Sequence, residues 1–140
     1  MLNIYTDGTY TSGNEYYGGA YIVYDEDKRV HQDSGVGSKA VSMRNVAGEL
    51  SAVMHATKWV AQNKQNAIII HDYNGISKWI TGEWSANNEF TQAYVRFMQP
   101  YYQRGIIRFQ WVKGHTGVLG NELVDGLARR AVIDKKQWNL

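Results

Sequence analysis

The chain has 140 residues, 44% of them hydrophobic, so it is long enough to bury a core and is expected to form one domain, residues 1–140. It contains no cysteine, which excludes disulfides and thiolate metal sites. The formal net charge is +2, but residues 1–50 hold four Lys or Arg and seven Asp or Glu, whereas residues 51–140 hold eleven and six. This asymmetry suggests that a polyanion lies across the second part, while cations gather near acids of the first.

Neither export nor membrane insertion is indicated. Asp7 interrupts the apolar start of the chain, so we do not expect a signal peptide. Apolar runs such as Ala67–Ile70 are far shorter than the roughly 20 residues that a membrane-spanning helix needs. We therefore expect a cytoplasmic protein that has no membrane partner.

The first part of the chain is expected to form three antiparallel strands. The first strand alternates apolar and polar residues and ends at Asp7-Gly8, a dipeptide that also suits a hairpin turn. A polar loop follows at residues 10–17, and short turn signals separate the next two strands. These strands are Leu2–Thr6, Gly18–Asp25 and Val30–Gly37.

Ser42–Lys64 carries apolar residues at helical spacing and predicts a long helix. Glu49 is a charged residue on the otherwise apolar, inward face of this helix, because Val53 and Val60 follow it at helical spacings of four and eleven positions. Burying a lone carboxylate is costly unless it is paired or binds a metal. The alternative is that Glu49 interacts with the positive end of the helix dipole.

Ala67–His71 is a short, Ile-rich run that is typical of a strand buried on both faces of a parallel sheet. Asp72 follows this strand directly. Ligand sites in such sheets gather at the carboxyl ends of the strands, which places Asp72 well for binding. The alternative is that Asp72 caps the next helix.

The elements that follow are a short helix at Ile76–Ile80, a connector at Thr81–Asn88, a helix at Phe90–Gln103 and a strand at Ile106–Val112. Pro100 is expected to bend the second of these helices or to end it early.

A glycine-rich loop that contains His115 leads into the last helix, for which Asn121 is the expected N-cap. Asp125 lies in about the first turn of this helix, at the edge of its apolar stripe. The tail, Asp134–Leu140, is expected to be exposed and frayed.

This order of elements predicts an α/β fold with a mixed five-stranded sheet, in which two parallel strands are added to three antiparallel ones and helices cover both faces. If the first and fourth strands are parallel neighbours, four carboxylates converge at one edge. They could not all stay ionised there without cations. Oxygen donors without thiols favour Mg²⁺ or Mn²⁺ over zinc, and two ions about 4 Å apart suit in-line cleavage of a phosphodiester. The four residues are Asp7, Glu49, Asp72 and Asp125.

Four segments in this order, TDG, NVAGEL, HDY and GHTGVLGNELVDGLA, resemble the ribonuclease H family of type 1. The resemblance covers nearly the whole chain and implies an endoribonuclease that cuts the RNA strand of RNA/DNA hybrids, leaving 5′-phosphate and 3′-hydroxyl ends. It matches the four acids to metal ligands that hold two Mg²⁺ ions with substrate bound, Mn²⁺ being a substitute. His115 matches a loop histidine that assists proton transfer or product release, and Glu49 matches a residue that touches the ribose 2′-hydroxyl.

The resemblance also implies candidate substrate-binding residues. Asn14, Asn45 and Asn74 stand where family members use polar side chains on the hybrid, although a turn or helix-cap role explains each of them equally well. Lys113 lies beside the glycine-rich loop and is a candidate for a phosphate contact. The implied partner is an RNA/DNA hybrid; no obligate protein partner is evident, so we expect a monomer.

The chain departs from well-known family members in the segment KWITGEWSANNEF, which is short and has a single lysine. Many members carry an extra helix and a basic protrusion there. The short form resembles ribonuclease H domains that are joined to a viroplasmin-type module, which implies weak hybrid binding by this chain alone. Trp79 and Trp84 in this region either stack on the nucleic acid or pack against the core.

Two other functions remain as alternatives. Integrases, transposases and junction resolvases share the predicted sheet and an acid cluster, but they usually lack the GHTG loop. A catalytically silent hybrid-binding module is the second alternative. Four mutually repelling acids argue against it, because such a set is hard to retain without a metal.

Overall fold

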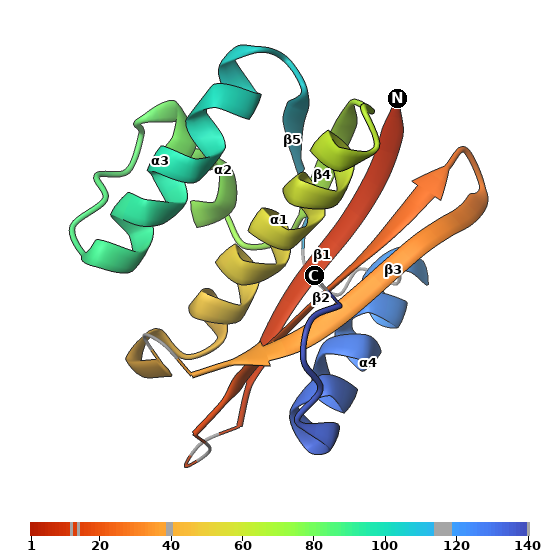
Figure 1. Ribbon diagram of the computed structural model, residues 1–140. Coiled ribbons are helices and arrows are strands. Elements are labelled where there is room, and N and C mark those ends of the chain that lie inside the picture. Colours follow the sequence, from red (N-terminus) through yellow and green to blue (C-terminus); the bar gives the residue numbers. More distant parts are fainter. Residues whose placement is uncertain (12, 14, 39–40, 114–118, 140) are drawn as a thin grey trace.

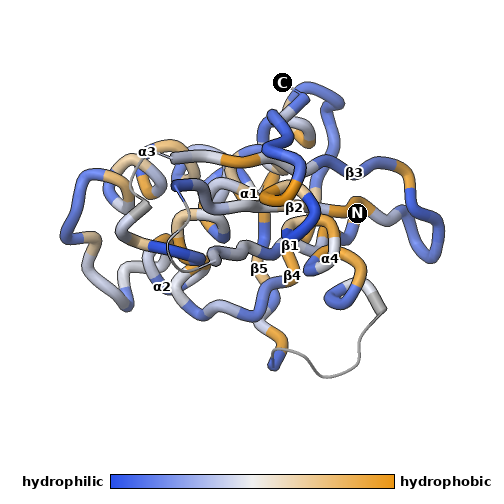
Figure 2. The backbone as a smooth tube through the Cα atoms, turned by 90° about the horizontal axis from the view of Figure 1, so that it is seen from below, coloured by the Kyte–Doolittle hydropathy of each residue, from blue (hydrophilic) through white to orange (hydrophobic). Residues whose placement is uncertain are grey.

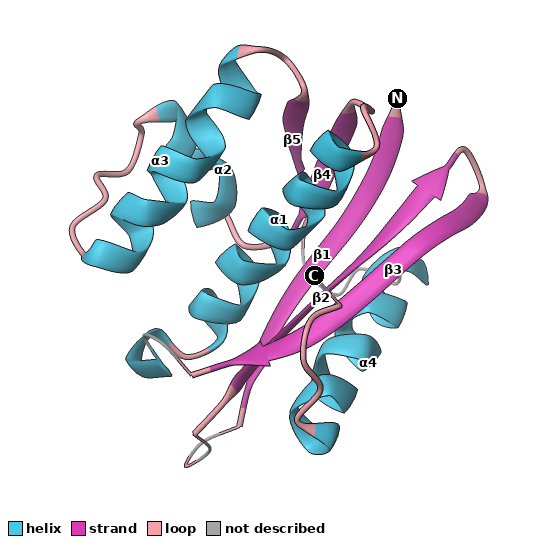
Figure 3. Cartoon of the chain, viewed as in Figure 1, coloured by secondary structure: helices cyan, strands magenta, loops and turns pink. Residues whose placement is uncertain are grey.

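The computed structural model describes residues 1–11, 13, 15–38, 41–113 and 119–139, and the structural statements below concern these residues. Three strands come first, and the other two strands lie between helices in the second part of the chain (Figure 3). The elements are β1 Leu2–Tyr10, β2 Tyr17–Asp25, β3 Lys28–Gly37, a 3₁₀ turn at Val41–Met43, α1 Asn45–Gln62, β4 Ala67–His71, α2 Gly75–Thr81, α3 Glu89–Gln103, β5 Ile107–Trp111 and α4 Leu119–Asp134.

The sheet has the strand order β3-β2-β1-β4-β5. β1 and β3 each pair antiparallel with β2, whereas β4 pairs parallel with both β1 and β5. α1 lies across one face of the sheet with α2 and α3 beyond it, and α4 covers the other face (Figure 1). The predicted mixed five-stranded sheet with helices on both faces is therefore confirmed.

β2 shows how the two faces are filled, because successive side chains of a strand point to opposite sides. Tyr21 and Val23 belong to the main core beneath α1, whereas Ala20 and Ile22 pack against α4. Hydrophobic stretches gather in the middle of the molecule, and many of the peripheral loops are hydrophilic (Figure 2). No helix among the described residues is long and apolar enough to cross a membrane.

β1 is longer than predicted. It continues past Thr6 to Tyr10, which pairs with Tyr17 of β2, so Asp7 and Gly8 lie inside a strand. Neither the predicted strand end nor the alternative of a hairpin turn at Asp7-Gly8 is correct. The long antiparallel pairing with β2 outweighs the local preference of an Asp-Gly pair for a turn.

One helix end agrees with its prediction and one helix start does not. α3 ends at Gln103, as predicted, and Pro100 in its last turn does not end it early, since the Pro100 carbonyl still accepts a hydrogen bond from Arg104 N at 3.2 Å. α4 begins at Leu119, so Asn121 lies inside the helix and is not its N-cap. The start of α4 packs so closely on β1 that a Cβ atom at Gly120 would overlap the ring of Tyr5.

The tail after α4 is docked, contrary to the expectation that it is frayed. Trp138 stacks on His55 of α1 with ring centroids 4.0 Å apart, and it lies so close to Gly35 of β3 that a Cβ there would overlap it. Lys136 Nζ contacts Asp33 Oδ1 at 3.1 Å, and Lys136 O accepts a hydrogen bond from Val36 N at 2.9 Å. The tail thus holds the outer edge of β3 and completes the core beside α1.

Candidate active site

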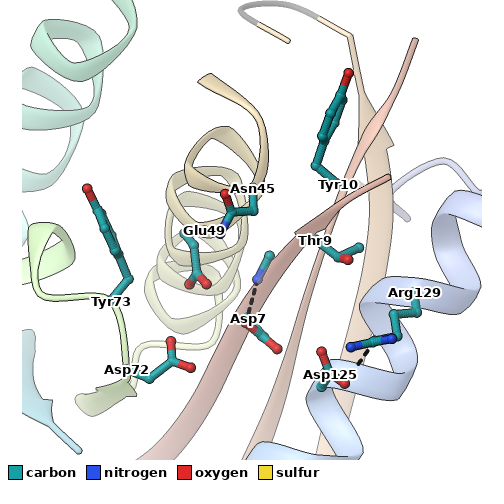
Figure 4. Close-up of a pocket in the computed structure, with 10 residues that line it drawn as sticks. Asp7, Thr9, Tyr10, Asn45, Glu49, Asp72, Tyr73, Asp125 and Arg129 are labelled. Carbon is teal, nitrogen blue, oxygen red and sulfur yellow. Dashed lines mark hydrogen bonds and ion pairs between the residues drawn. The ribbon is translucent and has the colours of Figure 1, made fainter. Parts of the chain in front are cut away.

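Three acids come together where β1 runs past the end of β4. The parallel register pairs Tyr5 with Ile70, so Asp7 lies level with Asp72, the residue after β4. Glu49 of α1 faces both from above the sheet (Figure 4). Ligand oxygens of Asp7, Glu49 and Asp72 all lie within 4.8 Å of one another. This confirms that three of the four predicted acids converge.

Two glycines allow α1 to bring Glu49 this close to β1. A Cβ atom at Gly8 of β1 would overlap the backbone of α1 at Glu49 and Asn45. A Cβ atom at Gly48 of α1 would overlap the carbonyl of Gly18 in β2. Side chains at these positions would push the helix away from the sheet, so the glycines determine the depth at which Glu49 enters the site.

The acids are strongly coupled because two of them are buried. Glu49 is 3% exposed and Asp7 is 7% exposed. Burial raises the pKa of Asp7 to about 7, although the Glu49 hydrogen bond lowers it and the Asp72 charge raises it further. Burial, followed by the charges of Asp7 and Asp72, raises the pKa of Glu49 well above its usual range. Without a cation, the site favours a shared proton over three charges.

The donor set fits a hard divalent cation. Three carboxylates supply oxygen ligands, and Glu49 Oε2 is buried without a hydrogen-bond partner among the described residues. A buried carboxylate oxygen with no partner is expensive, and a metal ion would satisfy it. Neither thiol nor imidazole belongs to this group of ligands, so the set suits Mg²⁺ or Mn²⁺ better than zinc.

Asp72 is held by its neighbours in the sheet. Trp111 Nε1, from the adjacent position of β5, donates to Asp72 O at 2.9 Å. His71 Nδ1 lies 3.0 Å from Tyr73 O, and burial lowers the pKa of His71 to about 4, so its neutral ring donates to this carbonyl. These bonds fix the peptide that carries Asp72. Asn74, and not Asp72, holds the N-cap position of α2, so the alternative of a helix-cap role for Asp72 is wrong.

Asp125 approaches the same site from α4, on the other side of β1 (Figure 4). It lies in the second turn of the helix and is not part of the trio within 4.8 Å. It lines a common cleft of about 410 Å³ with the trio, and its Oδ2 accepts a hydrogen bond from Arg129 Nε at 3.0 Å. The residues lining the cleft are Asp7, Gly8, Thr9, Tyr10, Asn45, Glu49, Asp72, Tyr73, Asp125 and Arg129.

The other candidate residues are distributed unevenly around this cleft. Asn45, the first residue of α1, lines it. Asn74 precedes α2 and does not line the cleft, and its side chain makes no capping hydrogen bond. Lys113 is exposed and also does not line it. Asn14 and His115 lie outside the described residues.

A cluster of three aromatic residues, Tyr73, Trp79 and Trp84, lies next to the cleft. Tyr73 lines the cleft, and its ring centroid lies 5.9 Å from that of Trp79 and 6.1 Å from that of Trp84. Trp79 packs against the main core, whereas Trp84 is 37% exposed and Lys78 Nζ lies 5.9 Å from its centroid. The packing alternative thus holds for Trp79. The connector between α2 and α3 contains no further helix.

Sequence reasoning missed Arg129 and Tyr73 as lining residues. Arg129 follows Asp125 by four positions, a spacing that places the two side chains next to each other on a helix. This spacing would have predicted the ion pair. Tyr73 directly follows Asp72, but nothing in the sequence shows that its ring points along the cleft.

Comparisons with known proteins show which family the chain belongs to. The model of the RNase H family matches residues 1–133. A protein of Bartonella bacilliformis named Ribonuclease H is 30% identical, and the match covers 98% of this chain and 92% of that protein. The crystal structure of RNase H1 from the halophilic archaeon Halobacterium salinarum has a TM-score of 0.78 at 20% identity, covering 95% of this chain and 98% of that one.

A further similar fold is that of LC11-RNase H1, whose crystal structure was determined in complex with an RNA/DNA hybrid. Its TM-score is 0.74 at 14% identity, and the match covers 94% of this chain and 99% of that chain. The family match over 133 residues, together with the acid trio at the end of β4, shows that this chain belongs to the ribonuclease H family of metal-dependent nucleases.

Proposed function

We propose that residues 1–140 form one catalytic domain that hydrolyses the RNA strand of RNA/DNA hybrids and leaves 5′-phosphate and 3′-hydroxyl ends. The observation that carries this proposal is the trio Asp7, Glu49 and Asp72, of which the first two are buried and in which Glu49 Oε2 has no hydrogen-bond partner among the described residues. The complex of LC11-RNase H1, which shares the fold, supports a hybrid as the substrate.

The trio would hold Mg²⁺, with Mn²⁺ as a substitute, and Asp125 would complete a site for two ions when substrate is bound. When bound, such ions activate the attacking water and stabilise the leaving oxygen. Asp7 and Glu49 must lose their proton before a cation can bind, because burial makes their ionised forms unfavourable. His115, which lies outside the described residues, is proposed to assist proton transfer or product release.

The choice of RNA is proposed to depend on Glu49, because a carboxylate at this depth of the cleft can accept a hydrogen bond from a ribose 2′-hydroxyl. Asn45, which lines the cleft beside it, would contact the hybrid. Asn14, Asn74 and Lys113 are proposed as more distant contacts to the hybrid. We further propose that the protein acts as a monomer in the cytoplasm.

The test uses one labelled strand sequence in four substrates: the strand is RNA in an RNA/DNA hybrid, in double-stranded RNA and in single-stranded RNA, and it is DNA in double-stranded DNA. With Mg²⁺, only the RNA strand of the hybrid should be cut, and excess chelator should abolish cleavage. Product ends are mapped by their response to phosphatase and ligase. Equal cleavage of double-stranded DNA would assign the chain to the integrase-like class, and full activity in chelator would contradict metal-assisted hydrolysis.

A further inference from the structure

The cleft is lined by a basic side chain in addition to its acids. Ten residues line it in the described part of the chain; four of them are acids, and Arg129 is the only Lys or Arg. Its side chain is 67% exposed and reaches Asp125, whose side chain is 25% exposed. Arg129 therefore lies at the mouth of the cleft and not in its buried floor.

Only one nitrogen of the Arg129 guanidinium donates a hydrogen bond to a described residue. Nε donates to Asp125 Oδ2 at 3.0 Å, and among the described residues the two Nη nitrogens contact no acceptor. An Arg side chain presents donors in a planar fork that matches a phosphate, so the unused donors could bind a phosphate oxygen. A nucleic-acid backbone that entered this cleft would pass the donors at its mouth.

The bond to Asp125 is easily exchanged. Exposed pairs four residues apart on a helix stabilise it only slightly, and salt weakens them further. A divalent cation that takes Asp125 as a ligand would compete directly with Arg129 for the same carboxylate. The guanidinium would then be released at the moment when the substrate strand enters.

We infer that Arg129 is a phosphate-binding residue of the cleft, which Asp125 holds in place until a cation takes that carboxylate and the nucleic-acid backbone takes the arginine. This inference rests on the proposed function, because it requires a hybrid in the cleft. It adds to that function a residue that grips the strand and a competition between one arginine and one metal ligand.

The chain offers a matched control one residue further along α4. Arg130 Nε pairs with Asp134 Oδ2 at 2.9 Å, also across four positions, and the Arg130 side chain is 73% exposed. Arg130 does not line the cleft. Arg129→Gln and Arg130→Gln thus remove the same charge from the same helix, and only the first removes a donor from the cleft.

The experiment measures binding of a fluorescent RNA/DNA hybrid by anisotropy over a series of salt concentrations, with Ca²⁺ replacing Mg²⁺ to slow cleavage. Arg129→Gln should reduce the slope of log affinity against log salt by about 1 and weaken binding about 5- to 10-fold near 0.1 M salt. Arg130→Gln should follow the native chain. Arg129→Lys should keep most of the slope, because the charge remains, but lose part of the affinity with the fork.

A second readout does not depend on nucleic acid. Calorimetric titration of the substrate-free protein with Mg²⁺ or Mn²⁺ should give tighter binding for Arg129→Gln, because Asp125 is no longer occupied, and unchanged binding for Arg130→Gln. In steady-state cleavage, Arg129→Gln should raise KM while kcat changes less than about twofold, which is the pattern of lost uniform binding.

Failure of the inference and failure of the proposed function give different results. If the native chain cleaves hybrid but Arg129→Gln and Arg130→Gln share one salt slope and one metal affinity, Arg129 binds no phosphate and the inference is wrong. If the native chain neither binds nor cleaves hybrid, the proposed function fails and the inference fails with it. Circular dichroism and the Tm of each variant, including Arg129→Lys, establish that the variants compared are folded.

Discussion

Replacing Asp7 by Asn should stabilise the metal-free protein at neutral and alkaline pH. Burial raises the pKa of Asp7 from its ordinary value of 3.8 to about 7. The folded state therefore holds this proton more tightly than the unfolded chain does, so stability declines as the pH rises from about 4 to about 7. Asn cannot ionise, and its carbonyl oxygen can still accept the hydrogen bond that Gly8 N donates to Asp7 Oδ1 at 2.9 Å.

The magnitude follows from the pKa. A rise of about three pH units, at about 1.4 kcal/mol each, makes ionised Asp7 cost the folded state about 4 kcal/mol. Part of this cost is shared with Glu49, which is coupled to the same proton, so we expect Asp7→Asn to gain about 2–4 kcal/mol at about pH 8 in chelator. At about pH 4, where Asp7 is protonated in the folded state, the two proteins should agree within about 0.5 kcal/mol.

The assay is urea denaturation of both proteins in chelator across this pH range. Asp27→Asn is the control, because it removes an equal charge from the exposed turn between β2 and β3 and should change stability by less than about 0.5 kcal/mol at every pH. A destabilised Asp7→Asn at alkaline pH, or a difference that does not vary with pH, would refute the reasoning. Asp7 would then have a structural role in β1 and not an electrostatic one.

Four further predictions concern activity, the tail and affinity. Glu49→Gln should lower turnover of hybrid by several orders of magnitude without loss of Tm, because it breaks the ligand set while relieving repulsion; single-turnover cleavage and thermal melting measure the two effects. His115→Ala should cost about 10²–10⁴ in kcat, the usual contribution of a general acid or base, and a milder loss than that of Glu49→Gln in the same assay would fit this role. Trp138→Ala should cost about 2–4 kcal/mol in urea denaturation because Trp138 completes the core beside α1, and a loss below about 0.5 kcal/mol would contradict the docked tail. Fusing a hybrid-binding module to the N-terminus should lower KM and leave kcat nearly unchanged, because it adds substrate binding without changing the chemical step. If the native chain already binds hybrid at nanomolar strength in physiological salt, another surface of this chain must bind the DNA strand.

Much of the fold could be read from the sequence, because local periodicity reflects local burial. The continuous apolar run of β4 predicted a strand buried on both faces, and the observed strand is Ala67–His71, as predicted. The helical spacing around Glu49 placed its side chain on the inward face, where it is 3% exposed. Both predictions, the buried strand and the inward-facing Glu49, needed only the pattern of apolar and polar residues along a short segment, which the sequence contains.

The candidate site could be named in part. Asp7, Glu49 and Asp72 were predicted as partners because each is an acid at the end of an apolar pattern or within one. Their separation was not predictable, because it depends on the register of β1 against β4 and on the close contact of α1 at Gly8. A register is a choice among alternative long-range pairings, and no local pattern in one chain distinguishes them.

The errors have the same cause. The Asp7-Gly8 pair favours a turn by itself, but pairing with β2 carries the strand on to Tyr10. The tail is polar apart from Trp138 and the terminal Leu140, and local composition predicts fraying. Only the folded chain provides the surface of α1 and β3 against which the Trp138 ring packs. The sequence thus determined which residues are able to form a strand, a helix or a ligand set. Tertiary structure decided where β1 ends, how close the acids lie and whether the tail docks, because these depend on contacts between segments far apart in the chain.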